Sequence, residues 1–155
     1  MIGTRCDASA SLLRISTIRK RRLNMATSPG HAKWPDHQVR EVPLNTRVIA
    51  KVGEDIIADS NAVIRVEEDG HPARHYFPRS DVSMDKLMPS DTTSKCPFKG
   101  TARYFNVLSD GHRLTDAAWS YEDPYEEHAA LKDRLAFYVD RVPEIRVTEQ
   151  TPSRQ

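Results

Sequence analysis

Residues 102–119 read ARYFNVLSDGHRLTDAAW, and this stretch indicates the fold. Ala102–Leu108 has the aromatic and β-branched content of a strand, and His112–Trp119 is a second run of the same kind. Ser109-Asp110-Gly111 separates them, and Asp-Gly is a strong signal for a tight turn. The stretch therefore predicts a β-hairpin.

Further short runs on both sides of this hairpin continue the β pattern. Arg47–Val52 alternates, with Val48, Ala50 and Val52 on one face. The turn signals Gly53-Glu54 and Asp69-Gly70 divide the upstream runs from one another. The other predicted strands are Asp55–Ser60, Ala62–Glu67, Arg74–Phe77, Leu135–Val139 and Ile145–Val147.

Two segments depart from this pattern. Residues 79–100 are crowded with proline and small polar residues, which favours a long ordered loop with one helical turn around Ser83–Leu87. Long loops inside compact domains are often functional. Tyr125–Arg134 has acidic residues in its first turn and basic residues in its last, which predicts a short helix near the C-terminal end.

The chain has 155 residues, of which 38% are hydrophobic and 29% charged, a balance typical of one folded domain. We expect this domain to span residues 34–147, after a flexible extension (1–33) and before a frayed tail (148–155). Residues 1–24 are rich in Arg and Ser. They have the composition of a mitochondrial transit peptide. Alternatively, Met25 is the native start and the upstream segment is unused.

Charge argues against two classes of partner. Residues 1–24 hold six Arg or Lys residues against Asp7, a charge of +5, so the remainder carries −4 of the total of +1. A mildly acidic domain has no general electrostatic attraction to nucleic acid or anionic lipid. No apolar run is long enough to span a bilayer. We therefore expect neither nucleic acid nor membrane as a partner, and the oligomeric state stays open.

The two cysteines, Cys6 and Cys96, lie far apart in regions of different character, so a disulfide framework is not expected. Free thiols favour a reducing compartment. The expected location is cytoplasmic, or mitochondrial if residues 1–24 act as a transit peptide.

Several segments together carry a family resemblance. The most specific are Cys96-Pro97-Phe98-Lys99-Gly100 and Ala118-Trp119-Ser120-Tyr121. The others are Ile57–Ser60, Tyr76–Pro78, Asp81-Val82, Ser90–Thr93, Ala102–Tyr104, Pro124, Ala136–Tyr138 and Arg141-Val142. In this order the chain resembles domain of unknown function 427, also labelled nucleotidyltransferase-like, over roughly residues 39–147. Members often have His just before the Cys-Pro pair, where this chain has Lys95.

The resemblance implies a small β-tent fold, with two antiparallel sheets meeting at an angle, and no established activity. Together with the strand pattern, it gives the expected fold class: mainly β, antiparallel, two-sheet, with one short helix near the C-terminal end.

The residues do not support nucleotidyl transfer. That reaction usually needs close carboxylates that hold Mg²⁺, and a cradle for phosphates. The sequence has no Asp-x-Asp pair; Asp81 and Asp85 lie four apart in the expected loop, and the glycines of the domain are isolated. No cofactor is therefore expected.

A metal site is not expected either. A closed zinc site needs four N or S ligands, and Cys96 is the one cysteine of the domain. His71 and His75 are four apart on a predicted strand, and His112 and His128 are isolated. We expect these histidines to be solvent-exposed.

Cys96 is a weak candidate for a reactive group. It lies beside Lys95 and Lys99, and nearby ammonium groups favour a thiolate if they are also close in space. The alternative is a small buried hydrophobic residue, as most free cysteines are.

The strongest functional expectation is a pocket between the 79–104 loop and Trp119. Basic, hydroxyl and aromatic side chains there suit a small anionic or aromatic ligand. The candidate ligand-binding residues are Arg79, Asp81, Thr93, Cys96, Lys99, Tyr104, Trp119 and Tyr121, and Tyr76 is a further aromatic near them. Two alternatives stay open: an enzyme with Cys96 or a loop Asp as the reactive group, and a protein-interaction domain whose loop is purely structural.

Overall fold

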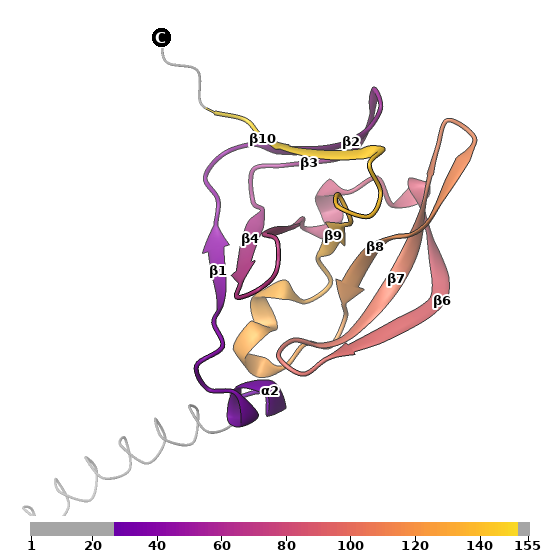
Figure 1. Ribbon diagram of the computed structural model, residues 1–155. Helices are drawn as coiled ribbons and strands as arrows, with labels where there is room; N and C mark the ends of the chain where they lie inside the picture. Colours follow the sequence, from indigo (N-terminus) through magenta and orange to yellow (C-terminus); the bar gives the residue numbers. More distant parts are fainter. Residues whose placement is uncertain (1–26, 152–155) are drawn as a thin grey trace, which may run out of the picture.

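The computed structural model describes residues 27–151, and their strands form three antiparallel sheets (Figure 1). The first sheet has the order β1-β4-β5, with β1 Val39–Pro43, β4 Ile64–Glu68 and β5 Arg74–Tyr76. The second has the order β10-β2-β3, with β10 Ile145–Glu149, β2 Val48–Val52 and β3 Asp55–Ser60. The third has the order β6-β7-β8-β9, with β6 Leu87–Cys96, β7 Gly100–Ser109, β8 His112–Tyr121 and β9 Leu135–Phe137.

The prediction of a mainly β, antiparallel domain is confirmed, with three sheets where two were expected. The hairpin at residues 102–119 is β7–β8, and its tight turn uses Asp110 (φ 50°) and Gly111 (φ 74°). Two consecutive positive φ angles match the right-handed twist of the flanking strands. This is why the Asp-Gly pair is a reliable signal there.

The expected loop at residues 79–100 is wrong, because most of it is ordered secondary structure. Two short 3₁₀ helices, η1 (Arg79–Asp81) and η2 (Met84–Lys86), precede the ten-residue strand β6. β6 is an edge strand whose side chains are mostly exposed. An edge strand tolerates Pro89 and needs no apolar alternation, so its sequence resembles a loop. The strand β1 was likewise not predicted.

The ends of the domain also differ from expectation. Residues 29–33, placed in a flexible extension, form the helix α2 (Pro29–Lys33), and Gly30 is buried. The expected tail begins with Thr148 and Glu149, which belong to β10 and pair with β2. The predicted transit peptide, and the last residues of the tail, lie outside the described residues. Near the C-terminal end, the expected short helix is the 3₁₀ helix η3 (Glu126–Leu131). No helix within residues 27–151 is long and apolar enough to cross a membrane.

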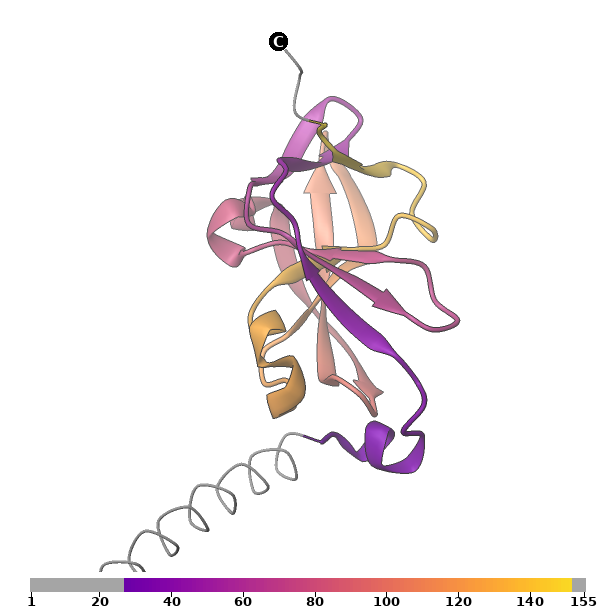
Figure 2. The same ribbon diagram turned by 90° about the vertical axis from the view of Figure 1, so that its left-hand side faces the viewer.

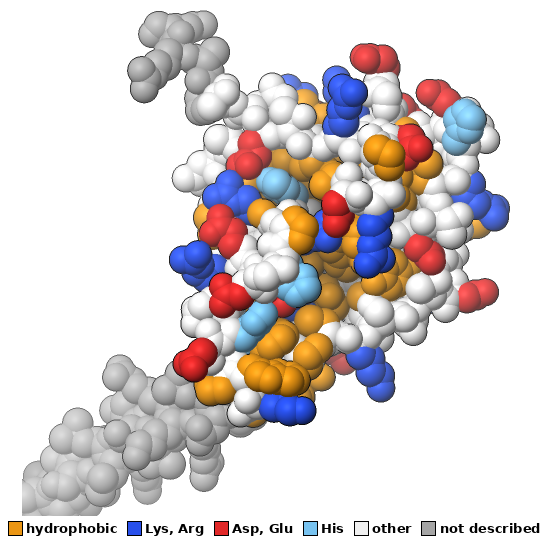
Figure 3. Space-filling model, in the orientation of Figure 1, with side chains coloured by type: hydrophobic (Ala, Val, Ile, Leu, Met, Phe, Trp, Pro, Cys, Tyr) orange, Lys and Arg blue, Asp and Glu red, His pale blue; other side chains and the backbone are white. Residues whose placement is uncertain are grey.

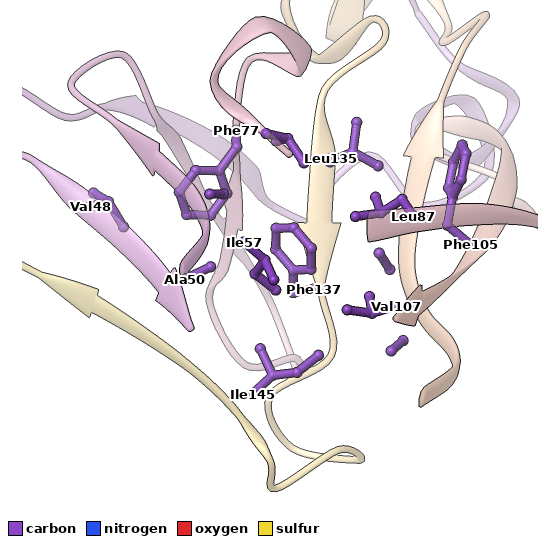
Figure 4. Close-up of a cluster of buried hydrophobic side chains, with 14 of the residues drawn as sticks. Val48, Ala50, Ile57, Phe77, Leu87, Phe105, Val107, Leu135, Phe137 and Ile145 are labelled. Atoms are coloured by element: carbon purple, nitrogen blue, oxygen red, sulfur yellow. The ribbon is translucent and has the colours of Figure 1, made fainter. Parts of the chain in front are cut away.

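The main hydrophobic core lies between the second and third sheets (Figure 4). Its centre holds Phe77 and Leu135, both fully buried. Their backbones exchange two hydrogen bonds, Phe77 N–H to Leu135 O at 2.8 Å and the reverse at 2.9 Å. This bridge joins the end of β5 to the start of β9, and so connects the first sheet to the third. The connection joins the two sheets at their edges, because β5 and β9 are edge strands.

Candidate ligand-binding cavity

A cavity of about 350 Å³ lies between the first and third sheets. β4 and β5 form one wall, and β6, β7 and β8 form the other. In Figure 3 hydrophobic side chains gather in a hollow on this face, with Lys, Arg and His side chains beside it. A volume of this size accepts a small molecule.

Strand alternation explains which side chains face the cavity. Tyr104 pairs with Trp119 across β7 and β8, and Tyr121 follows Trp119 by two residues. Cross-strand partners, and residues two apart on one strand, project from the same face of a sheet. Cys96 of β6 lies on this face as well, next to Gly100 in the register. The third sheet therefore presents all four side chains to one space.

The opposite wall follows the same rule. Val66 and Glu68 are two apart on β4, Arg74 and Tyr76 are two apart on β5, and all four line the cavity. The register pairs Val66 with Arg74.

Five of the eight predicted site residues line this cavity, namely Cys96, Lys99, Tyr104, Trp119 and Tyr121. Arg79, Asp81 and Thr93 do not. Arg79 instead donates to the carbonyl of Asp133 at 2.9 Å and to Ser120 Oγ at 3.1 Å. Asp81 accepts a hydrogen bond from Ser60 Oγ at 2.6 Å. Thr93 is exposed on the edge strand. These three residues therefore support the fold around the cavity or face solvent.

A buried ion pair closes one side of the cavity. Lys99 Nζ donates to Glu68 Oε2 at 2.6 Å, and also lies 3.7 Å from Cys96 Sγ. His37 Nε2 lies 3.0 Å from the other Glu68 oxygen. Burial alone raises the pKa of Glu68, but the hydrogen bonds from Lys99 and His37 outweigh it and hold the pKa below its usual value. Lys99 is thus a buried, paired cation rather than a solvated one.

Aromatic side chains form most of the remaining surface. Trp119 Nε1 donates to Tyr76 Oη at 3.2 Å, and the two rings meet edge to face at 6.1 Å between centroids. Tyr104 and Tyr138 stack at 6.2 Å, and their hydroxyls lie 3.3 Å apart. Such arrangements fix ring orientation, since edge-to-face and offset contacts are the favoured ones.

The hydroxyls of Tyr76, Tyr121 and Tyr138 stay protonated at neutral pH. Burial raises the pKa of Tyr76 and that of Tyr121 far above the usual value, and raises the pKa of Tyr138 to about 12. Tyr121 differs from the other two, because its hydroxyl makes no hydrogen bond to any residue in the described part of the chain. A neutral hydroxyl without a protein partner is available to a ligand.

Two arginines lie against the aromatic wall. The guanidinium of Arg74 lies 5.4 Å from the Trp119 ring and 5.2 Å from the Tyr138 ring, and it is paired with Asp140 at 2.7 Å. Arg141 lies 4.8 Å from the Tyr138 ring. Within residues 27–151 Arg141 makes no ion pair, and it is exposed. Lys95 also lines the cavity, is exposed and makes no ion pair in the described part of the chain. Arg141 and Lys95 are therefore both free to meet an anion, and Arg141 is the one that lies against the aromatic wall.

The sequence did not identify four of these cavity residues: Glu68, Arg74, Tyr138 and Arg141. The signal for Glu68 and Arg74 was present in the alternation of β4 and β5, which placed each two residues from a buried side chain. Arg141 belongs to a segment of the family resemblance, but it follows β9 in an irregular segment, so no strand alternation indicated which way its side chain faces.

The fold and the cavity define a small antiparallel β domain with an aromatic-lined space between two of its sheets. The sequence matches the family described as domain of unknown function DUF427 (NTP_transf_9) over residues 40–148, and the chain belongs to that family. No curated protein matches the sequence. The family title refers to nucleotidyl transfer, yet Glu68 is the one carboxylate among the cavity-lining residues, and it is paired with Lys99.

Proposed function

We propose that this domain binds a small molecule that combines a planar aromatic body with one anionic group. The observation that carries this proposal is the pairing, in one cavity, of an aromatic wall with the unpaired Arg141 and the unpartnered Tyr121 hydroxyl.

The charge balance limits the ligand. Lys99 and Arg74 already face Glu68 and Asp140, so each of these cations is largely neutralised. Arg141 and Lys95 are left as unpaired positive charges at the rim, and Arg141 is the one beside the aromatic wall. A single carboxylate or a monoester phosphate on the ligand matches it, since an arginine binds such groups with two parallel hydrogen bonds.

The aromatic residues determine the rest of the ligand. Ring faces and edges of Tyr76, Tyr104 and Trp119 give an apolar contact surface with fixed orientation. The Tyr121 hydroxyl then offers one hydrogen bond inside this area. A flat ring with a carbonyl or ring nitrogen suits this combination.

A thermal-shift screen tests the proposal, because a ligand that binds the folded state raises the melting temperature. The panel pairs aromatic carboxylates with their neutral amides and with aliphatic carboxylates of similar size. We expect the aromatic anions to stabilise the protein most. Equal shifts across the three classes, or no shift with any of them, would contradict the proposal.

Two variants then locate the site. Arg141→Gln removes the rim cation and Tyr121→Phe removes only a hydroxyl, and each should weaken binding about tenfold, the effect of losing one hydrogen bond of about 1.4 kcal/mol. Arg146→Gln is the matched control, because Arg146 is an exposed arginine that does not line the cavity. Affinity that is unchanged in both cavity variants would place the ligand elsewhere.

A second candidate function is thiol chemistry at Cys96, favoured by the 3.7 Å contact between Lys99 Nζ and the sulfur. We rank it second because no histidine or carboxylate of the described residues hydrogen-bonds Cys96 Sγ to act as a base. Cys96→Ser separates the two ideas, because it keeps the size of this cavity-lining side chain: the variant should still bind aromatic anions, whereas an enzyme that uses this thiol would lose all turnover.

A further inference from the structure

A second cluster of chemically active side chains lies outside the cavity, where α2 meets η3 (Figure 1, Figure 2). His31, Glu127 and His128 each offer one ligand atom, and these atoms all lie within 4.8 Å of one another. None of the three residues lines the cavity described above. The cluster is therefore an independent site.

His128 is buried, with only 4% of its surface exposed, although the sequence predicted an exposed imidazole. Both of its ring nitrogens are buried without a hydrogen-bond partner. Nε2 lies 3.7 Å from Glu127 Oε1, and Nδ1 lies 3.5 Å from Glu41 Oε2, which is itself buried and unpartnered. Buried polar atoms are nearly always satisfied in folded proteins, so this arrangement calls for a missing partner.

The hydrogen bonds of His31 also indicate a missing partner. Its Nε2 lies 3.1 Å from the backbone carbonyl oxygen of His37, which can only accept, so the ring proton is on Nε2. In the neutral ring Nδ1 then carries a lone pair, and it faces the Glu127 carboxylate in very close contact. A lone pair and a carboxylate that face each other are unfavourable unless a cation lies between them, and that cation is either a proton on Nδ1 or a metal ion.

We propose that His31 Nδ1, His128 Nε2 and the Glu127 carboxylate bind a divalent transition-metal ion of the zinc type. Two imidazole nitrogens and one carboxylate oxygen are a donor set that suits such an ion and leaves one coordination position open. The cation satisfies the buried Nε2 of His128 and replaces the unfavourable contact between His31 and Glu127.

Glu41 supports the arrangement by facing His128 rather than the metal ion. A histidine that binds metal through one nitrogen usually donates its other N–H to a carboxylate or carbonyl, which fixes the ring. Glu41 Oε2 faces His128 Nδ1, and the carbonyl of His37 faces His31 Nε2, so both imidazoles have this support.

An ion can reach this site, because the side chains of His31 and Glu127 are 18% and 20% exposed. Binding would also connect α2 to η3 across a sequence separation of 96 residues. The sequence could not reveal this, since His31 lay in an expected flexible extension, far in sequence from the adjacent pair Glu127 and His128.

The test is metal binding to the untagged full chain after chelator treatment. Zn²⁺ is titrated by calorimetry and Co²⁺ by its visible absorption. We expect saturation at one ion per chain and a higher melting temperature with Zn²⁺. His31→Gln and Glu127→Gln should abolish the Co²⁺ spectrum, whereas His112→Gln, which alters an exposed turn histidine, and Cys96→Ser should leave it unchanged.

Glu41→Gln is the sharper variant, because it leaves all three ligands in place. Loss of such a supporting carboxylate should weaken metal binding by on the order of 10- to 100-fold. The competing explanation is a protonated His31 paired with Glu127. It predicts no saturable metal binding and the same melting temperature with chelator as with Zn²⁺. Either of those results, or binding that survives His31→Gln and Glu127→Gln, overturns the proposal.

Discussion

Tyr104 on β7 lies directly opposite Trp119 on β8, so both rings project from the same face of the third sheet. Tyr76 approaches from the first sheet and accepts the Trp119 Nε1–H. One cross-strand pair therefore builds the floor of the cavity, and one hydrogen bond ties it to the opposite wall. The aromatic residues hold the two sheets together as well as form a binding surface.

This double role predicts that Trp119 contributes much more to the stability of the fold than Trp34 does. Trp119→Phe removes the donor to a fully buried Tyr76 hydroxyl and leaves a small void, and should lower the free energy of unfolding by about 2–4 kcal/mol. Trp34→Phe, at a side chain 48% exposed, should change it by less than about 0.5 kcal/mol. Urea denaturation of the two variants measures this. Similar losses would show that Trp119 is not a structural anchor.

Gly100 lies where the β6–β7 turn packs closely against the segment before η3, and a substitution there tests this close packing. Its φ is +126°, and an added Cβ would lie 3.2 Å from the carbonyl oxygen of Asp123. Gly70 also has a positive φ, +76°, but nothing lies within 4 Å of its Cβ position. Gly100→Ala should cost about 2–3 kcal/mol, and Gly70→Ala about 1 kcal/mol.

Thermal or urea unfolding of both glycine variants gives the comparison. The additional loss of stability in Gly100→Ala, compared with Gly70→Ala, measures two effects: the contact of the added Cβ with the backbone of residues 123–125, and the less accessible φ of Gly100. If Gly70→Ala were as destabilising as Gly100→Ala, the packing of the turn against residues 123–125 would not be the reason for glycine there.

The pH dependence of stability should report the Glu68–Lys99 pair. The pKa of Glu68 is lower in the folded protein than the ordinary value of 4.5, so the unfolded chain binds more protons at acidic pH. The stabilisation is complete well above pH 4.5, and is lost as the pH falls through the folded-state pKa.

Lys99→Met tests this assignment. It removes the ammonium that lowers the pKa of Glu68 and leaves the burial that raises it. The variant should be less stable at neutral pH, and its stability should fall less steeply on acidification than that of the wild type. Urea midpoints measured from pH 7 to pH 3 give both slopes, and parallel curves would contradict the assignment.

The sequence predicted the strands that have a clear alternation of apolar and polar residues or a clear turn, and it missed those that have neither. Strands with one buried face and a clear turn, such as β3 and the β7–β8 hairpin, were predicted nearly residue for residue. β6 was missed because an exposed edge strand lacks alternation, and β1 because its burial is only partial. Within the cavity, Trp119 and Lys99 stood out by residue type. Glu68 and Arg74 became visible only once the first sheet was placed against the third.

The N-terminal boundary gives the last prediction. Gly30 N–H donates to the carbonyl of Pro97 at 2.7 Å, and its missing side chain lets α2 lie against Phe98, whose ring would be 2.7 Å from an added Cβ. His37 stacks on the same ring at 4.3 Å. The segment 27–37 thus covers Phe98, which is 8% exposed, and belongs to the folded domain.

A chain that starts at Met25 keeps all of these contacts and should unfold at the same temperature as the full chain. A chain that starts at Gln38 uncovers Phe98 and should lose about 1.5–3 kcal/mol, the free energy of burying one large apolar side chain. Both are compared with the full chain by thermal denaturation in the presence of chelator, so that metal binding by His31 does not contribute. Equal stability of the Gln38 chain would mean that residues 27–37 lie on the domain without stabilising it, and a loss in the Met25 chain would assign a stabilising role to the residues before it.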